Sequence, residues 1–185
     1  MESQARPTGR DVDLLEYERL KDEQLGRINV RDNLVYATLA ASGGVIAIAF
    51  GGGTPRFPLL LLLPPACLVL GWTYLVNDQK VSAIGEYIRH ELSPRLSAAA
   101  GHELLRWESE HRRDADRTRR KITQVIVDVL LFCGSGVGGL GVFWALSPRI
   151  PWPLLTLSLV EIGALLLLAV EIIRCVDASR PAEVT

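Results

Sequence analysis

The sequence predicts an all-α, polytopic membrane protein built from two transmembrane helical hairpins, four spans in all, joined by a long polar connector. Charge and apolar residues are segregated along the 185-residue chain, although a hydrophobic share of 49% is an ordinary average. Helices of about 18 or more apolar residues cross a hydrocarbon core of ~30 Å. Four such runs carry two charges at most: residues 34–51, 57–76, 122–146 and 152–173. They lack the polar face of a helix buried in a water-soluble protein.

The N-terminal segment divides into a tail and a helix. Residues 1–10 are polar and predict a disordered tail. Residues 11–32 predict an amphipathic helix with one apolar face, about 80° wide, formed by Leu14, Tyr17, Leu25 and Ile28. The charges up to residue 32 are mixed, six basic and eight acidic, which favours a protein contact over an anionic-lipid anchor. The helix either lies in the membrane interface or packs against the connector.

The first hairpin is predicted over residues 33–76. In its first span, small residues at helical spacing form a smooth stripe of Ala40, Gly44, Ala47 and Gly51. Such stripes allow helix backbones to approach closely in lipid, so we expect a helix–helix seam, unless these residues reflect only the general abundance of Gly and Ala in spans. The pair Pro64-Pro65 predicts a kink or a late helix start.

The connector is predicted over residues 77–121, with the helix of the second span continuing into it. Ser93-Pro94 predicts a break or bend, and residues 97–101 a loop. A second helix is expected from about His102 directly into the third span. Trp107, a tryptophan far from the predicted membrane interfaces, suggests a contact with the N-terminal helix, another subunit or a cytosolic partner.

The second hairpin is predicted over residues 122–174, followed by a tail at 175–185. Its first span holds five glycines in eight residues, among them the GxxxG pair Gly134 and Gly138. These glycines either permit close packing or loosen the helix. Pro151-Trp152-Pro153 predicts the start of the last span.

The distribution of Lys and Arg predicts the orientation. Eighteen of the twenty lie in the N-terminal segment, the connector and the C-terminal end from Arg174 onward, and each hairpin turn holds one. The positive-inside rule then predicts a multi-pass protein of the cell (inner or plasma) membrane, with both termini and the connector in the cytoplasm. Aromatic belts agree with this: Trp144 and Trp152 at the outer side, and Tyr36, Trp72 and Tyr74 near the inner side.

The two outer turns resemble each other. Residues 54–58 read TPRFP and residues 147–151 read SPRIP, each matching [S/T]-P-R-apolar-P. Either an ancestral duplication of a two-span unit or convergence on short turns explains the match.

Two acids within the spans are the candidate functional residues. Asp128 lies ~10 Å into the third helix and Glu161 ~13 Å into the fourth, at 1.5 Å per residue. Charges in lipid are costly and mark function or an internal partner. The acids therefore either line a polar path for protons or cations, or are protonated or hydrogen-bonded to Thr, Ser or Gln and hold the bundle together. Glu171, three residues before Arg174, is expected to be structural.

The sequence argues against several classes of function. It shows no nucleophile elbow, phosphate-binding glycine loop or metal-ligand cluster, so we expect no enzyme, cofactor or metal site. Three cysteines without a CxxC pair support neither a disulfide framework nor zinc. A net charge of −1, without an Arg stripe interleaved with aromatics, argues against nucleic-acid binding.

Two stretches carry a resemblance to known proteins. Residues 17–34, YERLKDEQLGRINVRDNL, and 71–89, GWTYLVNDQKVSAIGEYIR, resemble a group of small bacterial integral membrane proteins of uncharacterised function. More distantly they are similar to SLATT-type two-span domains, in which cytoplasmic helices flank a membrane hairpin. The resemblance implies a membrane-disrupting effector in nucleotide-signalled defence. The second hairpin departs from that two-span pattern, and no functional residue transfers.

Three functions follow as hypotheses. The first is an oligomeric membrane effector or channel, with polar residues of the third and fourth spans lining a path that the cytoplasmic helices gate. The second is a non-catalytic scaffold or regulatory subunit that binds a cytosolic partner. The third is a small proton-coupled transporter, which so long a connector makes less attractive. The small-residue stripes favour a homo-oligomer, although one four-helix bundle would also use them.

Overall fold

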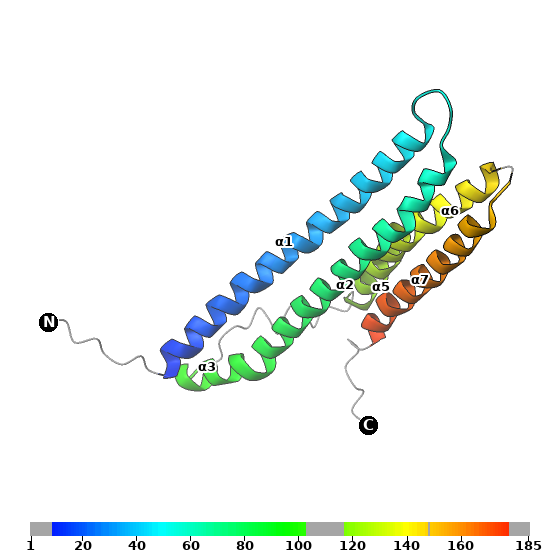
Figure 1. Cartoon of the computed structure of the whole chain (residues 1–185). Coiled ribbons are helices and arrows are strands. Elements are labelled where there is room, and N and C mark those ends of the chain that lie inside the picture. Colours follow the sequence, from blue (N-terminus) through cyan, green and yellow to red (C-terminus); the bar gives the residue numbers. More distant parts are fainter. Residues whose placement is uncertain (1–8, 103–116, 148, 178–185) are drawn as a thin grey trace. The chain divides into compact units, whose positions relative to one another are not determined.

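The computed structural model describes residues 9–102, 117–147 and 149–177, and all regular elements in this part of the chain are helices (Figure 1). Four helical stretches are long and apolar enough to cross a membrane. This confirms an all-α, multi-pass membrane protein. The elements are the α-helices α1 (Gly9–Phe50), α2 (Leu63–Tyr87), α3 (Ser93–Ala100), α5 (Arg117–Asp128), α6 (Ser135–Leu146) and α7 (Trp152–Asp177), the 3₁₀ helix η1 (Phe57–Leu62), and the π-helical turns η2 (Ile88–Leu92) and η3 (Val129–Gly134).

The chain divides into two compact units. One, here called the helix-pair unit, comprises Met1–Val30 and Asn77–Arg117; the other, the bundle unit, comprises Arg31–Val76 and Thr118–Thr185. The division after Val76 coincides with the predicted end of the first hairpin. The predicted tail at residues 1–10 lies outside the described residues, except for Gly9 and Arg10, with which α1 begins.

In the helix-pair unit, the first part of α1 packs against the connector. Ile88, Leu92 and Leu96 are almost completely buried, and Tyr17 and Leu20 of α1 pack against them. Three hydrogen bonds between polar groups also join α1 to the connector helix. Gln24 Nε2 donates to the Val81 carbonyl at 3.2 Å, Arg27 donates to Asn77 Oδ1 at 3.5 Å, and the Tyr87 hydroxyl donates to Glu16 at 2.8 Å. Of the two alternatives for this helix, packing on the connector is therefore the one that forms.

The connector helix does not break at Pro94. Helix continues from Leu63 to Ala100, through the π turn η2 immediately before Ser93, and Figure 1 shows it curving over this stretch. A proline inside a helix removes one backbone donor and crowds the preceding turn, and a wider π turn relieves that crowding. The loop predicted for residues 97–101 is also wrong: α3 runs to Ala100 and ends at Gly101, whose φ of 73° suits glycine.

The Tyr87–Glu16 hydrogen bond predicts a dependence of stability on alkaline pH. The bond to the Glu16 carboxylate raises the pKa of Tyr87 above its ordinary value. A raised folded-state pKa means that the folded form binds the proton more tightly, so this stabilisation is complete below the unfolded pKa of about 10 and is lost as pH rises through the folded value. We expect the Tyr87→Phe variant not to show this loss of stability at alkaline pH. Thermal unfolding of wild type and Tyr87→Phe between neutral and strongly alkaline pH measures this change in stability. A difference in stability between the two proteins that stays the same at every pH would contradict the prediction.

In the bundle unit, the first hairpin joins α1 to α2. A Cβ at Gly51 would lie 2.5 Å from the Ala47 carbonyl oxygen, and Gly52 and Gly53 have φ values of 92° and 85°, so three successive positions at this helix end favour glycine. The chain then forms η1, and α2 starts only at Leu63, with Pro64 in its first turn. The late helix start predicted from the proline pair is confirmed.

The second hairpin joins the third span to α7. The third span consists of α5, the π turn η3 and α6, and α7 begins where Pro151 and Pro153 predict it, with the Pro151 carbonyl accepting from the amides of Leu154 and Leu155. It continues to Asp177, beyond the predicted end at residue 174. Figure 1 shows both hairpins, with the turns of the two at the same end. We call that end the turn side and the opposite end the connector side.

Two clusters of buried side chains hold the bundle unit together. The turn-side cluster comprises Ala49, Leu60, Leu61, Leu63, Cys67, Leu140, Phe143 and Leu165. The connector-side cluster comprises Tyr74, Leu75, Phe132, Cys133, Leu168 and Ile172. Each cluster receives residues from α2, the third span and α7, so these three segments form the core of the unit.

Candidate functional site

Asp128 ends α5 and is buried, with an exposed fraction of 8%. The Tyr74 hydroxyl of α2 donates to its Oδ2 at 3.1 Å, and Gln124 Nε2 donates to the same hydroxyl at 3.2 Å. The Tyr74 ring also lies 5.0 Å from the Phe132 ring. Asp128 therefore belongs to a polar cluster that ties the third span to α2, which favours the structural interpretation of this acid.

The Tyr74 donor to Asp128 is not among the partners that the sequence predicts. The sequence predicts Thr, Ser or Gln as donors to Asp128 and places Tyr74 in an aromatic belt. Tyr74 is buried instead, whereas Tyr36 and Trp72 are exposed as belt residues should be. The proximity of Gln124 to Asp128 can be predicted from the sequence, because Gln124 precedes Asp128 by four residues and so lies on the same helix face. The partner on α2 has no such local signal.

Glu161 of α7 is equally buried, at 8% exposed, but its surroundings differ. Its Oε2 has no hydrogen-bond partner among the residues that the structure describes. Ser158, one turn nearer the turn side, donates to the Leu155 carbonyl at 2.9 Å and accepts from Trp144 Nε1 at 3.2 Å. The nearest hydroxyl on this face of α7 is therefore already engaged, and a buried carboxyl oxygen is left unsatisfied.

In the part of the chain that the structure describes, the two acids lie in different surroundings. Asp128 bonds to Tyr74, a member of the connector-side cluster, whereas Ile162 and Leu165, the neighbours of Glu161 on α7, pack in the turn-side cluster. Glu171, the third acid considered, accepts from Arg174 at 2.9 Å as predicted. Glu161 is thus the intramembrane acid without an evident structural role.

Glycines at the helix contacts are not those of the GxxxG pair. A Cβ at Gly138 would meet nothing within 4 Å, and one at Gly134 would meet only residues of its own helix. A Cβ at Gly139 would instead lie 2.7 Å from Leu63 of α2, and one at Gly136 would lie 2.8 Å from Leu165 of α7. Packing within the bundle therefore uses Gly136 and Gly139, and the prediction for Gly134 and Gly138 is wrong for contacts inside the chain.

The small-residue stripe of α1 is exposed as well. Ala40, Gly44, Ala47 and Gly51 all lie on the exposed side of the helix, while Thr38 and Ala49 are completely buried. A Cβ at Gly44 would meet nothing within 4 Å. The stripe forms no seam within the described chain, and a seam with a second copy stays a prediction.

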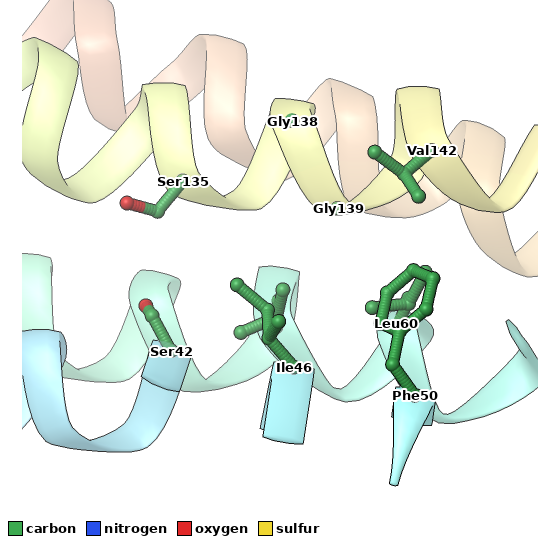
Figure 2. A pocket seen from close by; sticks show the side chains of 9 residues that line it. Ser42, Ile46, Phe50, Leu60, Ser135, Gly138, Gly139 and Val142 are labelled. Carbon is green, nitrogen blue, oxygen red and sulfur yellow. The ribbon is translucent and has the colours of Figure 1, made fainter. Parts of the chain in front are cut away.

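A groove separates α1 from α6 in the bundle unit (Figure 2). It has a volume of about 350 Å³, and η1 and the start of α2 contribute to its lining. Figure 2 shows Ser42 and Ser135 facing it from opposite helices at one end, and Phe50 and Val142 at the other. Its lining is almost entirely apolar, comprising Ser42, Ile46, Phe50, Leu60, Leu63, Ser135, Gly138, Gly139 and Val142. Such a surface suits hydrocarbon or another helix and offers no acid, base or metal ligand.

The predicted partner face of the N-terminal helix is divided by the fold. Tyr17 packs inside the helix-pair unit, and Ile28 is half-buried, but Leu14 and Leu25 are exposed. The packed stripe follows Tyr17, Leu20, Gln24 and Arg27, at spacings of three, four and three residues. Because Gln24 and Arg27 are polar, a search for apolar periodicity does not detect this stripe. Trp107 lies outside the described residues.

No group of three or more His, Cys, Asp or Glu side chains suited to hold a metal ion occurs in the described part of the chain. The cysteines are free thiols, with Cys67 and Cys133 buried and Cys175 half-buried.

The chain matches no protein-family model, no curated protein and no solved structure. The resemblance to SLATT-type domains stays a prediction.

Proposed function

We propose that this protein is an oligomeric membrane effector or channel, in which Glu161 lies on the path of the transported ion and the helix-pair unit gates that path. The observation that carries the proposal is the buried Glu161 carboxyl, whose Oε2 has no partner among the described residues. An unsatisfied carboxyl at membrane depth is costly and brings no packing advantage. A functional role explains the buried Glu161 carboxyl better than a contribution to the stability of the fold does.

The orientation and the assembly are parts of the same proposal. The concentration of Lys and Arg outside the two turns supports cytoplasmic termini and connector in the cell membrane. The uncovered small residues of two helices, Gly44 and Ala47 on α1 and Gly138 on α6, support self-association, since small residues let helices approach in lipid. The resemblance to SLATT-type domains agrees with an effector role.

Ion and proton flux through proteoliposomes tests the proposal. We expect the purified wild-type chain to conduct, and Glu161→Gln, which keeps the shape but removes the charge change, to lower the flux about tenfold or more, a barrier increase of about 1.4 kcal/mol. Glu171→Gln is the matched control, because Glu171 lies on the same helix but pairs with Arg174. Equal flux in wild type and Glu161→Gln, or no flux in wild type, would contradict the proposal.

A scaffold or regulatory subunit is the second candidate, and an observation in the helix-pair unit supports it. Val12 and Leu15, three residues apart on α1, are more than half exposed, as is Leu25, so these apolar side chains are available for contact with a partner. Leu15→Glu and Leu25→Glu discriminate between the candidates. Loss of a defined cytosolic partner with unchanged flux favours the scaffold, whereas altered flux in the absence of any other protein favours gating.

A further inference from the structure

We infer that the Glu161 carboxyl is a proton-binding site that exchanges protons with the turn side of the membrane. The inference rests on the proposed function and deepens it, because it names the proton as the ion that this site takes and the side from which the proton comes.

Among the described residues, the polar side chains nearest Glu161 on the packed face of α7 lie toward the turn side. Ser158 is completely buried and lies three residues before Glu161, hence on the same face of α7. Its hydroxyl accepts from the indole of Trp144, near the turn-side end of α6, and 37% of Trp144 is exposed. The order from the surface inward is therefore Trp144, Ser158 and Glu161.

Toward the connector side, apolar residues follow Glu161. Leu165 and Leu168 are the next residues on the buried face of α7, and each is 1% exposed. Leu165 lies against Gly136, while Leu168 and the completely buried Phe132 lie against Gly71. This apolar layer lies between Glu161 and the polar cluster of Tyr74 and Asp128. A polar side chain on the turn side and apolar side chains on the connector side lead us to expect that protons reach Glu161 from the turn side.

The chemistry of the site suits a proton better than a metal cation. A proton needs one oxygen and neutralises the carboxyl, whereas a dehydrated cation such as Ca²⁺ needs six to eight oxygen ligands. The surroundings of Glu161 are apolar, because Ile162 and Leu165 beside it pack in the turn-side cluster. Two thiols lie near this part of α7: Cys133 donates to the Leu165 carbonyl at 3.6 Å, and Cys67 of α2 packs with Leu165 in the turn-side cluster.

A lipid-soluble carbodiimide, dicyclohexylcarbodiimide, reports the protonated acid directly. The carboxyl O–H adds across one C=N bond, the oxygen bonding to the central carbon and the proton going to nitrogen. The acyl group then moves from oxygen to nitrogen, giving a stable N-acylurea without a leaving group. A carboxylate lacks the proton that this addition needs, so the label records the protonation of Glu161 without requiring transport.

The experiment uses the full-length chain in sealed, strongly buffered proteoliposomes with acidic buffer on one side and alkaline buffer on the other. The fraction of molecules with turns facing outward is measured by maleimide labelling of Thr54→Cys in a Cys175→Ser background. We expect mass spectrometry to find N-acylurea on Glu161 in the fraction of molecules whose turns face the acidic compartment, and none in Glu161→Gln.

Each outcome has a defined meaning. Labelling that follows the connector-side pH, or that ignores the gradient, overturns the inference, as does an unlabelled Glu161 in acid on both sides. If the wild type conducts but the labelling of Glu161 does not depend on the side that is acidic, the proton site is contradicted and the channel proposal is not. Side-dependent labelling without any flux keeps the proton site and contradicts the channel.

Discussion

Gly139→Val is expected to destabilise the bundle unit by about 1–3 kcal/mol, the usual cost of adding methylenes to a packed core. A Cβ at this position would lie 2.7 Å from Leu63 Cδ1 and 3.3 Å from the Leu60 carbonyl oxygen. The carbonyl belongs to the backbone and cannot rotate away as a side chain does. Relief therefore requires α6 to move from η1 and α2, which would open the turn-side cluster.

Gly138→Val is the matched control one residue earlier. A Cβ at Gly138 would meet nothing within 4 Å in the single chain, and glycine in a helix interior is disfavoured by up to about 1 kcal/mol, so this substitution should leave the stability of the monomer unchanged or raise it slightly. Unfolding of both variants in mixed micelles, followed by circular dichroism, makes the comparison. Equal losses at both positions would show that the packed face of α6 is assigned incorrectly.

Glu161→Leu should stabilise the protein while removing its function. Replacing an unsatisfied buried carboxyl by an apolar side chain of similar size removes a penalty of about 1–3 kcal/mol. The same substitution at Asp128 should act in the opposite direction, because it leaves the buried Tyr74 hydroxyl without its acceptor, at a cost of about 1–3 kcal/mol.

The pair of substitutions separates a functional acid from a structural one. Unfolding free energies in the same micelles and flux in the same vesicles give the two measurements. The expected pattern is a more stable, inactive Glu161→Leu and a less stable Asp128→Leu. If Glu161→Leu loses stability as Asp128→Leu does, the Glu161 carboxyl has a partner that holds the bundle together, and its assignment to an ion path fails.

The comparison of Asp128 and Glu161 also shows how far the sequence can assign a site. Both acids stand out from the sequence because each interrupts an apolar run, and both are in fact buried to the same extent. Their difference comes from other helices: Tyr74 of α2 bonds Asp128, whereas the hydroxyl nearest Glu161 on its own helix is engaged by Trp144. Tyr74 lies 54 residues from Asp128 along the chain, and Trp144 lies 14 residues from Ser158. No local pattern encodes such partners.

What the sequence by itself determined is the set of four membrane-crossing helices, their pairing into hairpins and the polar connector between them. These features depend on the length of uncharged runs and on proline and glycine at the turns, which are local properties of the chain. The late start of α2 and the beginning of α7 follow from the same local chemistry.

Only the tertiary structure decided which face of each helix is packed. Gly134 and Gly138 satisfy the GxxxG pattern, yet Gly136 and Gly139 make the contacts, because the rotation of α6 about its axis is set by Leu63 and Leu165 on its neighbours. Continuity of the connector helix through Pro94 likewise depends on the π turn before it and on the burial of Leu92 and Leu96 against α1. Burial against a neighbouring helix outweighs local preference at these positions, since the free energy of packing exceeds that of a single proline or glycine preference.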